Sequence, residues 1–441
     1  MTSHTGHLPP NYRWNFWALF VDFVGYMTCL TFISPSSVLP AFVRELTDSP
    51  TLIGLSGTIF AAGYLLPQLL VAHWVRDRPR TKPFLMATLP GRGLFLVITL
   101  ALWAGMAARP TALLILFFVS LTLFAVNDGA SNVPWNEFVA RAIPLARRGR
   151  LFGLSQIIQG IAGIGAGAVI SRILGDTTLQ FPNNYIVLFL AATVPLVPSS
   201  IALMLLKEPP PLETADRALT AARTNWRTIL SRDGDYRRIL VCRALLLMAG
   251  MAIPFYVVHA QDVLGLPGNV IGVFVMAQTL STVAASALFG IVSDRWGPRY
   301  VVRIATIAGG MAPLLALGAH LAQSRLAAQA YPIVYVALGV ANSAYMLGFA
   351  NYLLAISPEH DRPTYIGLNS TILGVMAVVP TVGGWILQTT SYTFLFCLAG
   401  ALGLAAFLTA TGLRMPERAS ATGTVQPDGP PAPASDSSAW K

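Results

Sequence analysis

Three ionisable residues interrupt long apolar stretches of the sequence: Asp22, Arg92 and Asp128. A charged side chain at membrane depth costs at least ~2.5 kcal/mol on insertion scales, so such a residue is usually kept for pairing, binding or proton transfer. Residue counts place all three in the cytoplasmic half of the first predicted helix bundle, where they can form one cluster. Two interpretations follow. Arg92 forms a structural ion pair with Asp22 or Asp128, or Asp128 handles a substrate or a proton.

The elements that must position these residues are membrane-spanning helices. Of the 441 residues, 54% are hydrophobic and 11% are charged, and apolar runs of the roughly 20 residues needed to cross a bilayer recur along the chain. Because lipid offers the backbone no hydrogen-bond partner, such runs must be helical. The sequence predicts an all-α polytopic membrane protein with twelve transmembrane helices, which start near Trp14, Leu52, Pro83, Ala112, Leu151, Tyr185, Arg238, Asn269, Tyr300, Tyr331, Tyr365 and Tyr392.

Arginine is distributed unevenly between the predicted loops. The loops after the even-numbered helices carry most of it, whereas the loops on the other side carry only Arg44, Arg109, Arg172 and Arg325. By the positive-inside rule the arginine-rich loops are cytoplasmic, which also puts both termini in the cytoplasm. We therefore expect a multi-pass protein of the cell membrane (inner or plasma membrane). The net charge of +10 is explained by these loops, so no nucleic acid partner is expected.

The second half of the chain repeats the first. Residues 136–160 align with residues 350–374 so that Pro144 meets Pro358 and Arg148 meets Arg362, and residues from His73 align with residues 290–299 at nearly the same offset. Six helices in each half give the two halves the same orientation, which is a parallel repeat. The expected organisation is a cytoplasmic N-terminal segment (1–13), a six-helix bundle (14–206), a cytoplasmic linker (207–236), a second six-helix bundle (237–413) and a disordered cytoplasmic tail (414–441).

The repeat pairs two helical stripes. Asp128, Asn132 and Trp135 follow the spacing of one helix face, which predicts a polar surface that lines a cavity. The repeat carries Asp128 onto Asn342, whose stripe includes Tyr345. On these two faces, only the first half therefore carries a protonatable group.

Three further patterns lead to expectations about packing and surface position. The glycine series that starts at Gly160 predicts a close-packing surface for a neighbouring helix. Arg243, near the start of helix seven, is expected to reach the cytoplasmic surface. His259, near the other end of that helix, is expected to lie at the membrane interface.

The stretch "GIVSDRWGPR" (residues 290–299) resembles the signature of the major facilitator superfamily, Gly-x-x-x-Asp-Arg-x-Gly-x-Arg/Lys. Gly290, Asp294, Arg295, Gly297 and Arg299 match it. A degraded copy after helix two keeps only Asp77 and Arg78, since His73 and Arg80 replace the two glycines. The resemblance covers about residues 14–412 and implies a carrier that works by alternating access.

The resemblance also implies a role for the signature. In this family the aspartate is thought to hold the two halves together at the cytoplasmic face when the carrier is open outward, and a helix N-terminus favours such an anion. We expect Gly290 to allow close helix approach, and Arg295 and Arg299 to pair with Glu137 or Glu359 or with anionic lipid. Arg141, Arg148 and Arg362 belong to the same cytoplasmic network. The alternative is that these charges only determine topology.

The function expected from these features is secondary transport of a small molecule. Proton-coupled export of a lipophilic compound is favoured, and the alternatives are a symporter or facilitator for a polar metabolite, or a transporter-like receptor or assembly protein. The helix-five motif Gly-Pro-x-x-Gly-Gly, typical of proton antiporters of the family, has no counterpart there; its partial form, "PTVGG", stands at residues 380–384 in helix eleven. No nucleotide-binding loop, catalytic constellation, cofactor site or metal site is predicted, so an enzyme is not expected. We expect a monomer in the lipid bilayer, with protons as the candidate coupling ion.

Overall fold

The computed structural model describes residues 9–76, 78, 80–209, 226–358 and 362–414, and within them every regular element is helical. These residues contain twelve stretches that are long and apolar enough to cross a membrane. The twelve predicted helices are therefore confirmed. The largest differences at a start are Leu145 in place of Leu151 and Arg325 in place of Tyr331.

The first half holds six spans, some of them broken into two helices. The helices are α1 (Tyr12–Phe32), α2 (Val38–Leu46), α3 (Pro50–Arg76), α4 (Lys82–Ala87), α5 (Leu94–Trp103), α6 (Pro110–Ala142), α7 (Leu145–Gly175), α8 (Asn183–Thr193) and α9 (Leu196–Met204).

The second half repeats this plan. Its helices are α10 (Trp226–Arg232), α11 (Gly234–Ala249), α12 (Ile253–Asp262), α13 (Val270–Trp296), α14 (Pro298–Ala322), α15 (Arg325–Ala330), α16 (Pro332–Ala344), α17 (Asn351–Ile356), α18 (Arg362–Met376), α19 (Val379–Thr389) and α20 (Tyr392–Thr411). The short helix α10 lies inside the segment expected to be a linker. This part of the segment packs on the second bundle, since Ile229 is buried in its core.

Several spans break where proline or glycine interrupts the helical hydrogen bonds. In the third span the sequence Leu89–Gly93 ("LPGRG") forms a tighter helical turn between α4 and α5, and this turn carries Arg92. Gly91 is required there, because a Cβ would lie 2.1 Å from the side chain of Asn127, whose amide donates to the carbonyl of Thr88 at 2.6 Å. The break thus sets the position of an intramembrane arginine.

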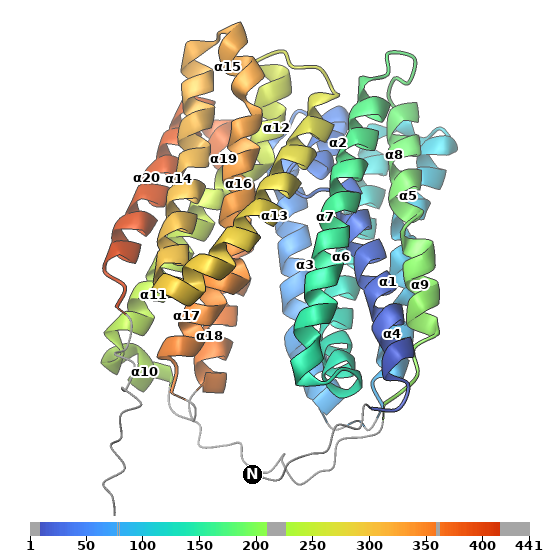
Figure 1. The fold of residues 1–441 in the computed structure, drawn as a ribbon. Helices are drawn as coiled ribbons and strands as arrows, with labels where there is room; N and C mark the ends of the chain where they lie inside the picture. The colour runs from blue at the N-terminus through green and yellow to red at the C-terminus, as the bar shows by residue number, and fades with distance from the viewer. Residues whose placement is uncertain (1–8, 77, 79, 210–225, 359–361, 415–441) are drawn as a thin grey trace, which may run out of the picture.

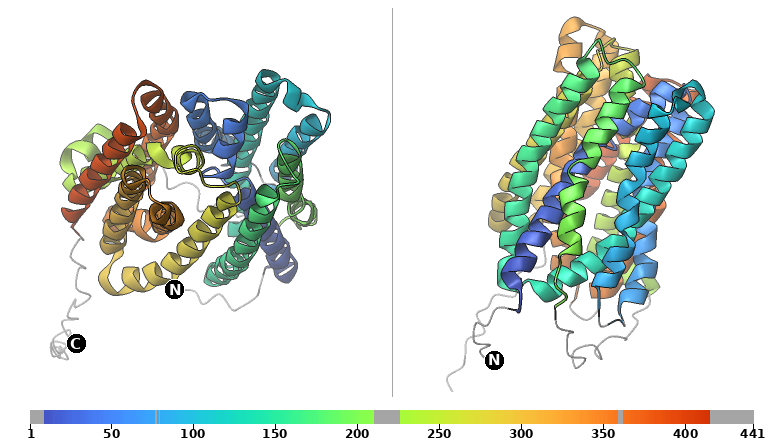
Figure 2. Two further views of the ribbon diagram at one scale, coloured as in Figure 1. Left: turned by 90° about the horizontal axis from the view of Figure 1, so that it is seen from above. Right: turned by 90° about the vertical axis from the view of Figure 1, so that its right-hand side faces the viewer.

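The two halves lie side by side, and two glycine-lined seams join them (Figures 1 and 2). In the α7–α13 seam a Cβ on Gly272 would lie 2.2 Å from the carbonyl oxygen of Gly167, and in the α3–α19 seam a Cβ on Gly54 would lie 2.2 Å from that of Pro380. The glycine series from Gly160 is therefore a close-packing surface, as predicted. The seams are related by the repeat, since helices two and five of the first half correspond to helices eight and eleven.

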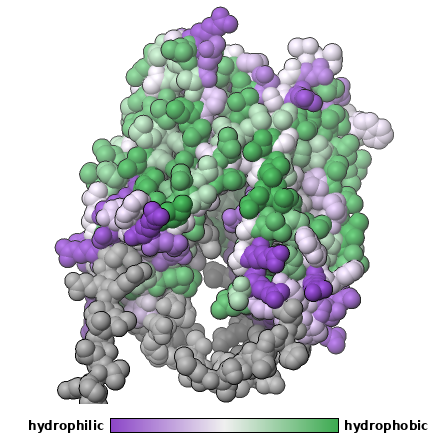
Figure 3. Space-filling view, in the orientation of Figure 1, coloured by the Kyte–Doolittle hydropathy of each residue, from purple (hydrophilic) through white to green (hydrophobic). Residues whose placement is uncertain are grey.

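The bundles meet at one end and separate at the other. We call the end of residues 209 and 226 the linker end, and the opposite end, near α2 and α12, the closed end. At the closed end Arg44 Nε lies 2.7 Å from Asp262 Oδ2, across the two halves. Toward the linker end a hollow lies between the halves (Figure 3), and the hydrogen bonds that join the halves among the described residues involve positions 36–58 of the first half.

Candidate functional site

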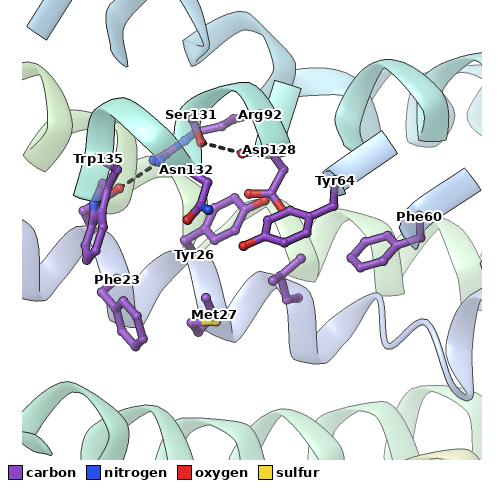
Figure 4. Close-up of a pocket in the computed structure, with 12 residues that line it drawn as sticks. Phe23, Tyr26, Met27, Phe60, Tyr64, Arg92, Asp128, Ser131, Asn132 and Trp135 are labelled. Atoms are coloured by element: carbon purple, nitrogen blue, oxygen red, sulfur yellow. Dashed lines mark hydrogen bonds and ion pairs between the residues drawn. The ribbon is translucent and has the colours of Figure 1, made fainter. Parts of the chain in front are cut away.

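A cavity of about 270 Å³ in the first half collects the intramembrane charges. It opens between α1, α3 and α6, with Arg92 reaching it from the broken third span (Figure 4). Most of its lining is aromatic or apolar, and the polar side chains lie on one side. The lining residues are Asp22, Phe23, Tyr26, Met27, Leu30, Phe60, Tyr64, Arg92, Asp128, Ser131, Asn132 and Trp135.

Asp22 and Arg92 form a buried and fully bonded ion pair. Arg92 Nη2 lies 2.8 Å from Asp22 Oδ1, and the side chains are 11% and 3% exposed. Trp135 Nε1 donates to the other carboxylate oxygen at 2.8 Å. Ser199 of α9 donates to Asp22 Oδ1 at 2.8 Å and accepts from Arg92 Nη1 at 2.6 Å. Such saturation is what an ion pair needs in order to be tolerated at this depth.

The close approach of α9 to α1 makes Ser199 available to this pair. A Cβ on Gly25 would lie 2.5 Å from the carbonyl oxygen of Pro195, so glycine is needed where the helices meet. Sequence reasoning missed Ser199, because a serine in an apolar span carries no charge signal. Its only sequence signal was its place beside proline and serine in "PLVPSS".

Asp128 lies in the same cavity but outside this network. It is half-buried, lies beside Tyr26 and Tyr64 (Figure 4), and forms no ion pair among the described residues. Its neighbour Gly129 lets α6 pack tightly on α3, since a Cβ there would lie 2.2 Å from the carbonyl oxygen of Tyr64. Arg92 therefore pairs with Asp22 and not with Asp128, and the Asp128 carboxylate faces the cavity without an ion pair among the described residues.

All three residues of the predicted α6 stripe, Asp128, Asn132 and Trp135, line this cavity. Asn132 lies half-buried on the lining and accepts from Asn136 at 3.0 Å, while Trp135 contacts Asp22 as described. The stripe thus joins the candidate coupling residue to the structural ion pair.

A larger and more apolar cavity, of about 510 Å³, is lined mostly by the second half, with Ala61 and Leu65 of α3 completing its wall. Asn342, the repeat partner of Asp128, lines it, as does Arg243. Arg243 is 6% exposed, lies over the Phe349 ring at 5.3 Å and donates to Asn369 at 3.1 Å. The expectation that Arg243 reaches the surface is therefore wrong, because these two contacts hold its guanidinium inside the bundle. The side chain of Tyr345 lies outside the described part of the chain.

The signature loop is placed at the linker end. Asp294 and Arg295 are exposed at the end of α13, and Gly297 has φ 92°, a conformation that glycine adopts readily. A Cβ on Gly290 would meet nothing within 4 Å, so the predicted close helix approach is absent at that position in this conformation. Arg299 lies over the ring of Tyr300 at 4.9 Å. Arg78 is exposed, and Asp77 lies outside the described residues.

Among the described residues, the contacts of the expected cytoplasmic network lie within the first half. Glu137 binds Arg141 on its own helix at 2.8 Å. Arg148 donates to the carbonyl oxygens of Ala140 and Ile143, at 2.7 and 3.0 Å, and so satisfies the end of α6. In this conformation Glu137 therefore contacts Arg141 rather than Arg295 or Arg299. Glu359 and the side chain of Arg362 lie outside the described part of the chain.

Comparison with known proteins identifies the sequence pattern. The sequence model of the Major Facilitator Superfamily matches residues 18–277 and 239–441. The quinolone resistance protein NorA of Staphylococcus aureus is 29% identical over 161 residues, which is 36% of this chain and 39% of NorA. The chain thus matches about two fifths of the length of this relative.

Two other comparisons cover more of the chain. An uncharacterised protein of Mycobacterium bovis, Mb2232, is 24% identical over 388 residues, 85% of this chain and 72% of that protein. The crystal structure of a bacterial homologue of the iron transporter ferroportin, in its inward-facing state, is similar in fold with a TM-score of 0.67. That match covers 91% of this chain and 97% of the other at 14% identity.

Proposed function

The chain belongs to the major facilitator superfamily, and from this premise we propose that it exports a lipophilic compound across the cell membrane in exchange for protons, with Asp128 as the coupling residue. That it is a membrane transporter rather than an enzyme follows from the family. The observation that carries the finer proposal is the difference between the two aspartates: Arg92 forms an ion pair with Asp22, whereas Asp128 faces the cavity with no ion pair among the described residues.

A cavity carboxylate without a cation is suited to exchange a proton. The free energy of ionising a carboxylate depends on how much water reaches it and on the charges nearby. Opening the halves at one end and then at the other changes the access of water to Asp128, whereas the Asp22–Arg92 pair keeps its bonds within the first half. Its repeat partner Asn342 cannot titrate, which limits the coupling to the first half.

The lining of the cavities supports a lipophilic substrate. The second cavity is lined mainly by Leu and Ala side chains, with Asn342, Arg243 and Tyr256 as its polar residues, and aromatic rings dominate the first. The relative from Staphylococcus aureus carries quinolone resistance in its name, which fits export of an aromatic compound. The polar side of the first cavity, Asp128 with Ser131 and Asn132, supports the second candidate, a symporter for a polar metabolite.

We further propose that the linker end is cytoplasmic, so that this conformation is open inward. The arginine-rich loops lie at that end, as the positive-inside rule requires. Separation at the closed end and closure at the linker end would then give the outward-open state, with Asp294 binding across the halves. In the present conformation Asp294 is exposed at an open end, which is where the proposed latch would be released.

The test first identifies a compound that binds the protein and then measures transport of that compound. A thermal-shift screen of the purified protein identifies compounds that stabilise it by binding. The best of them is then followed in proteoliposomes, in which counter-flow of labelled compound separates a carrier from a receptor. We expect an imposed proton gradient to drive accumulation on the acidic side. Accumulation on the alkaline side would favour the symporter, and counter-flow that fails would overturn transport of that compound.

A further inference from the structure

A hydrogen-bonded chain of side chains lies at the closed end of the second half, far from Asp128 in sequence and in the other bundle. His259 of α12 is fully buried among the side chains of the second half. Its Nδ1 lies 3.1 Å from Tyr331 Oη and its Nε2 lies 3.1 Å from His320 Nδ1. Tyr331 Oη in turn donates to the carbonyl oxygen of Tyr256 at 3.0 Å.

The direction of each hydrogen bond in this series fixes which ring nitrogens carry hydrogen. A tyrosine hydroxyl has one hydrogen, and Tyr331 uses it on the carbonyl of Tyr256, so Tyr331 must accept from His259 Nδ1–H. A neutral His259 then has a lone pair on Nε2, which accepts from His320 Nδ1–H. His320 Nε2 is therefore the one imidazole nitrogen of the pair left with a lone pair for a further proton.

The environment allows the pair to take one proton but not two. His320 is half-buried at the end of α14, whereas His259 is enclosed by the rings of Tyr392 and Phe396 at 5.0 and 5.2 Å. A proton added at His320 strengthens its donation to His259, because the bond becomes charge-assisted. A second proton on His259 Nε2 would set two N–H groups against each other at 3.1 Å. The two rings therefore act as one proton-binding site.

This site shares helix α12 with the ion pair that joins the halves. Asp262 lies one turn after His259 on α12 and binds Arg44 of the first half; Arg44 also binds Asp48. The groups that face the site from the neighbouring elements are His320, Tyr331, Tyr392 and the Tyr256 carbonyl. The nearby charges are Asp262 and Arg44, together with Glu45 and Asp48 beside Arg44. A positive charge on the histidine pair attracts Asp262 and repels Arg44, and so weakens the ion pair between the halves.

We propose that His259 and His320 form a one-proton site that faces the closed end and that its occupancy favours opening of this end. The hydrogen-bonded chain of side chains ends on the Tyr256 carbonyl oxygen, and the Tyr256 side chain is part of the lining of the larger apolar cavity. This inference does not require the coupling role of Asp128. Because the Arg44–Asp262 pair is about one third exposed, the expected change in the open population is modest, about two- to fivefold.

Nitrogen NMR of the full-length protein in nanodiscs, with ¹⁵N-labelled histidine, tests the site itself. The signals are assigned with His259→Gln and His320→Gln. We expect neutral His259 to carry its hydrogen on Nδ1 and the pair to take up one proton as the pH is lowered. Tyr331→Phe should release the fixed tautomer, whereas Tyr335→Phe should not, because the Tyr335 hydroxyl contacts the Ser36 carbonyl instead. Independent titration of both rings, or His259 with its hydrogen on Nε2, would overturn the site.

Distance measurement between spin labels tests the effect on opening. Labels at Thr111 and Gln329 report on the closed end of the two halves, in an Asp128→Asn background so that the proposed coupling residue does not contribute. The longer distance should become more populated as the pH falls, and His320→Gln should remove this dependence, while Arg44→Gln should favour the longer distance at every pH. A distance distribution that does not change while the pair takes up its proton would refute the link to the gate.

Discussion

Arg92 binds Asp22 at 2.8 Å and leaves Asp128, on the same cavity wall, without an ion pair among the described residues. A single arginine thereby leaves two carboxylates of one helical bundle in different surroundings. The assignment depends on the broken third span, which brings Arg92 to α1, and on Gly25, which brings Ser199 to the pair. It leads to a stability test and a transport test that can be made independently.

Asp22→Asn should destabilise the protein strongly, because it leaves the guanidinium of Arg92 buried without its counter-ion. Removing one partner of a buried pair costs about 3–5 kcal/mol of unfolding free energy. The double variant with Arg92→Gln should lose less than the two single changes together. Unfolding in detergent, followed by tryptophan fluorescence, measures these differences. Equal destabilisation by Asp128→Asn would contradict the separate roles.

The α7–α13 seam predicts a glycine effect with a matched control. Gly272→Ala puts a Cβ 2.2 Å from the Gly167 carbonyl oxygen, whereas a Cβ at Gly165, on the other side of α7, meets nothing within 4 Å. Gly272→Ala should therefore separate the halves at the closed end, and Gly165→Ala should not. The rate at which a thiol reagent labels Ser36→Cys, in a background with the exposed Cys397 replaced by serine, reports this separation. Equal rates in both alanine variants would argue against the seam as the closing surface.

Asp294→Asn should slow transport while leaving the stability of the present conformation unchanged. Asp294 is exposed here, so its charge matters only when the linker end closes and a helix N-terminus approaches it, an interaction of about 0.3–2 kcal/mol. Turnover in proteoliposomes and the thermal unfolding midpoint separate the two effects. Unchanged turnover would leave the signature as a topology signal.

The orientation proposed from the distribution of arginine can be measured with reporter fusions. A reporter that works only in the cytoplasm should be active when fused after Arg80, within residues 210–225, and at the C-terminus. It should be inactive near Asp48 or Arg325, which lie at the closed end. Activity at either closed-end position would reverse the proposed orientation of the linker end.

The sequence predicts the fold well, because membrane insertion imposes strong rules on it. Apolar length determined the twelve spans, and the glycine series from Gly160 correctly indicated tight packing. The same reasoning placed Asp22, Arg92 and Asp128 near one another, since depth in the membrane follows from residue count.

What the sequence could not predict depends on rotation about helix axes and on contacts between distant spans. The choice of Asp22 over Asp128 depends on Ser199, which has no charge to mark it. Arg243 is held inside by Phe349 and Asn369, which come from two other spans, and His259 is buried by contacts with His320 and Tyr331. Position along a single helix does not reveal such partners.

The central claim is that Asp128 couples the movement of substrate to protons, and transport by Asp128→Asn tests it most directly. Net transport driven by a proton gradient and substrate exchange without a gradient are measured in the same proteoliposomes. Because asparagine imitates the protonated carboxyl group and matches the repeat partner Asn342, we predict that exchange continues and that the gradient no longer has an effect. Gradient-driven transport that persists in Asp128→Asn would contradict the account.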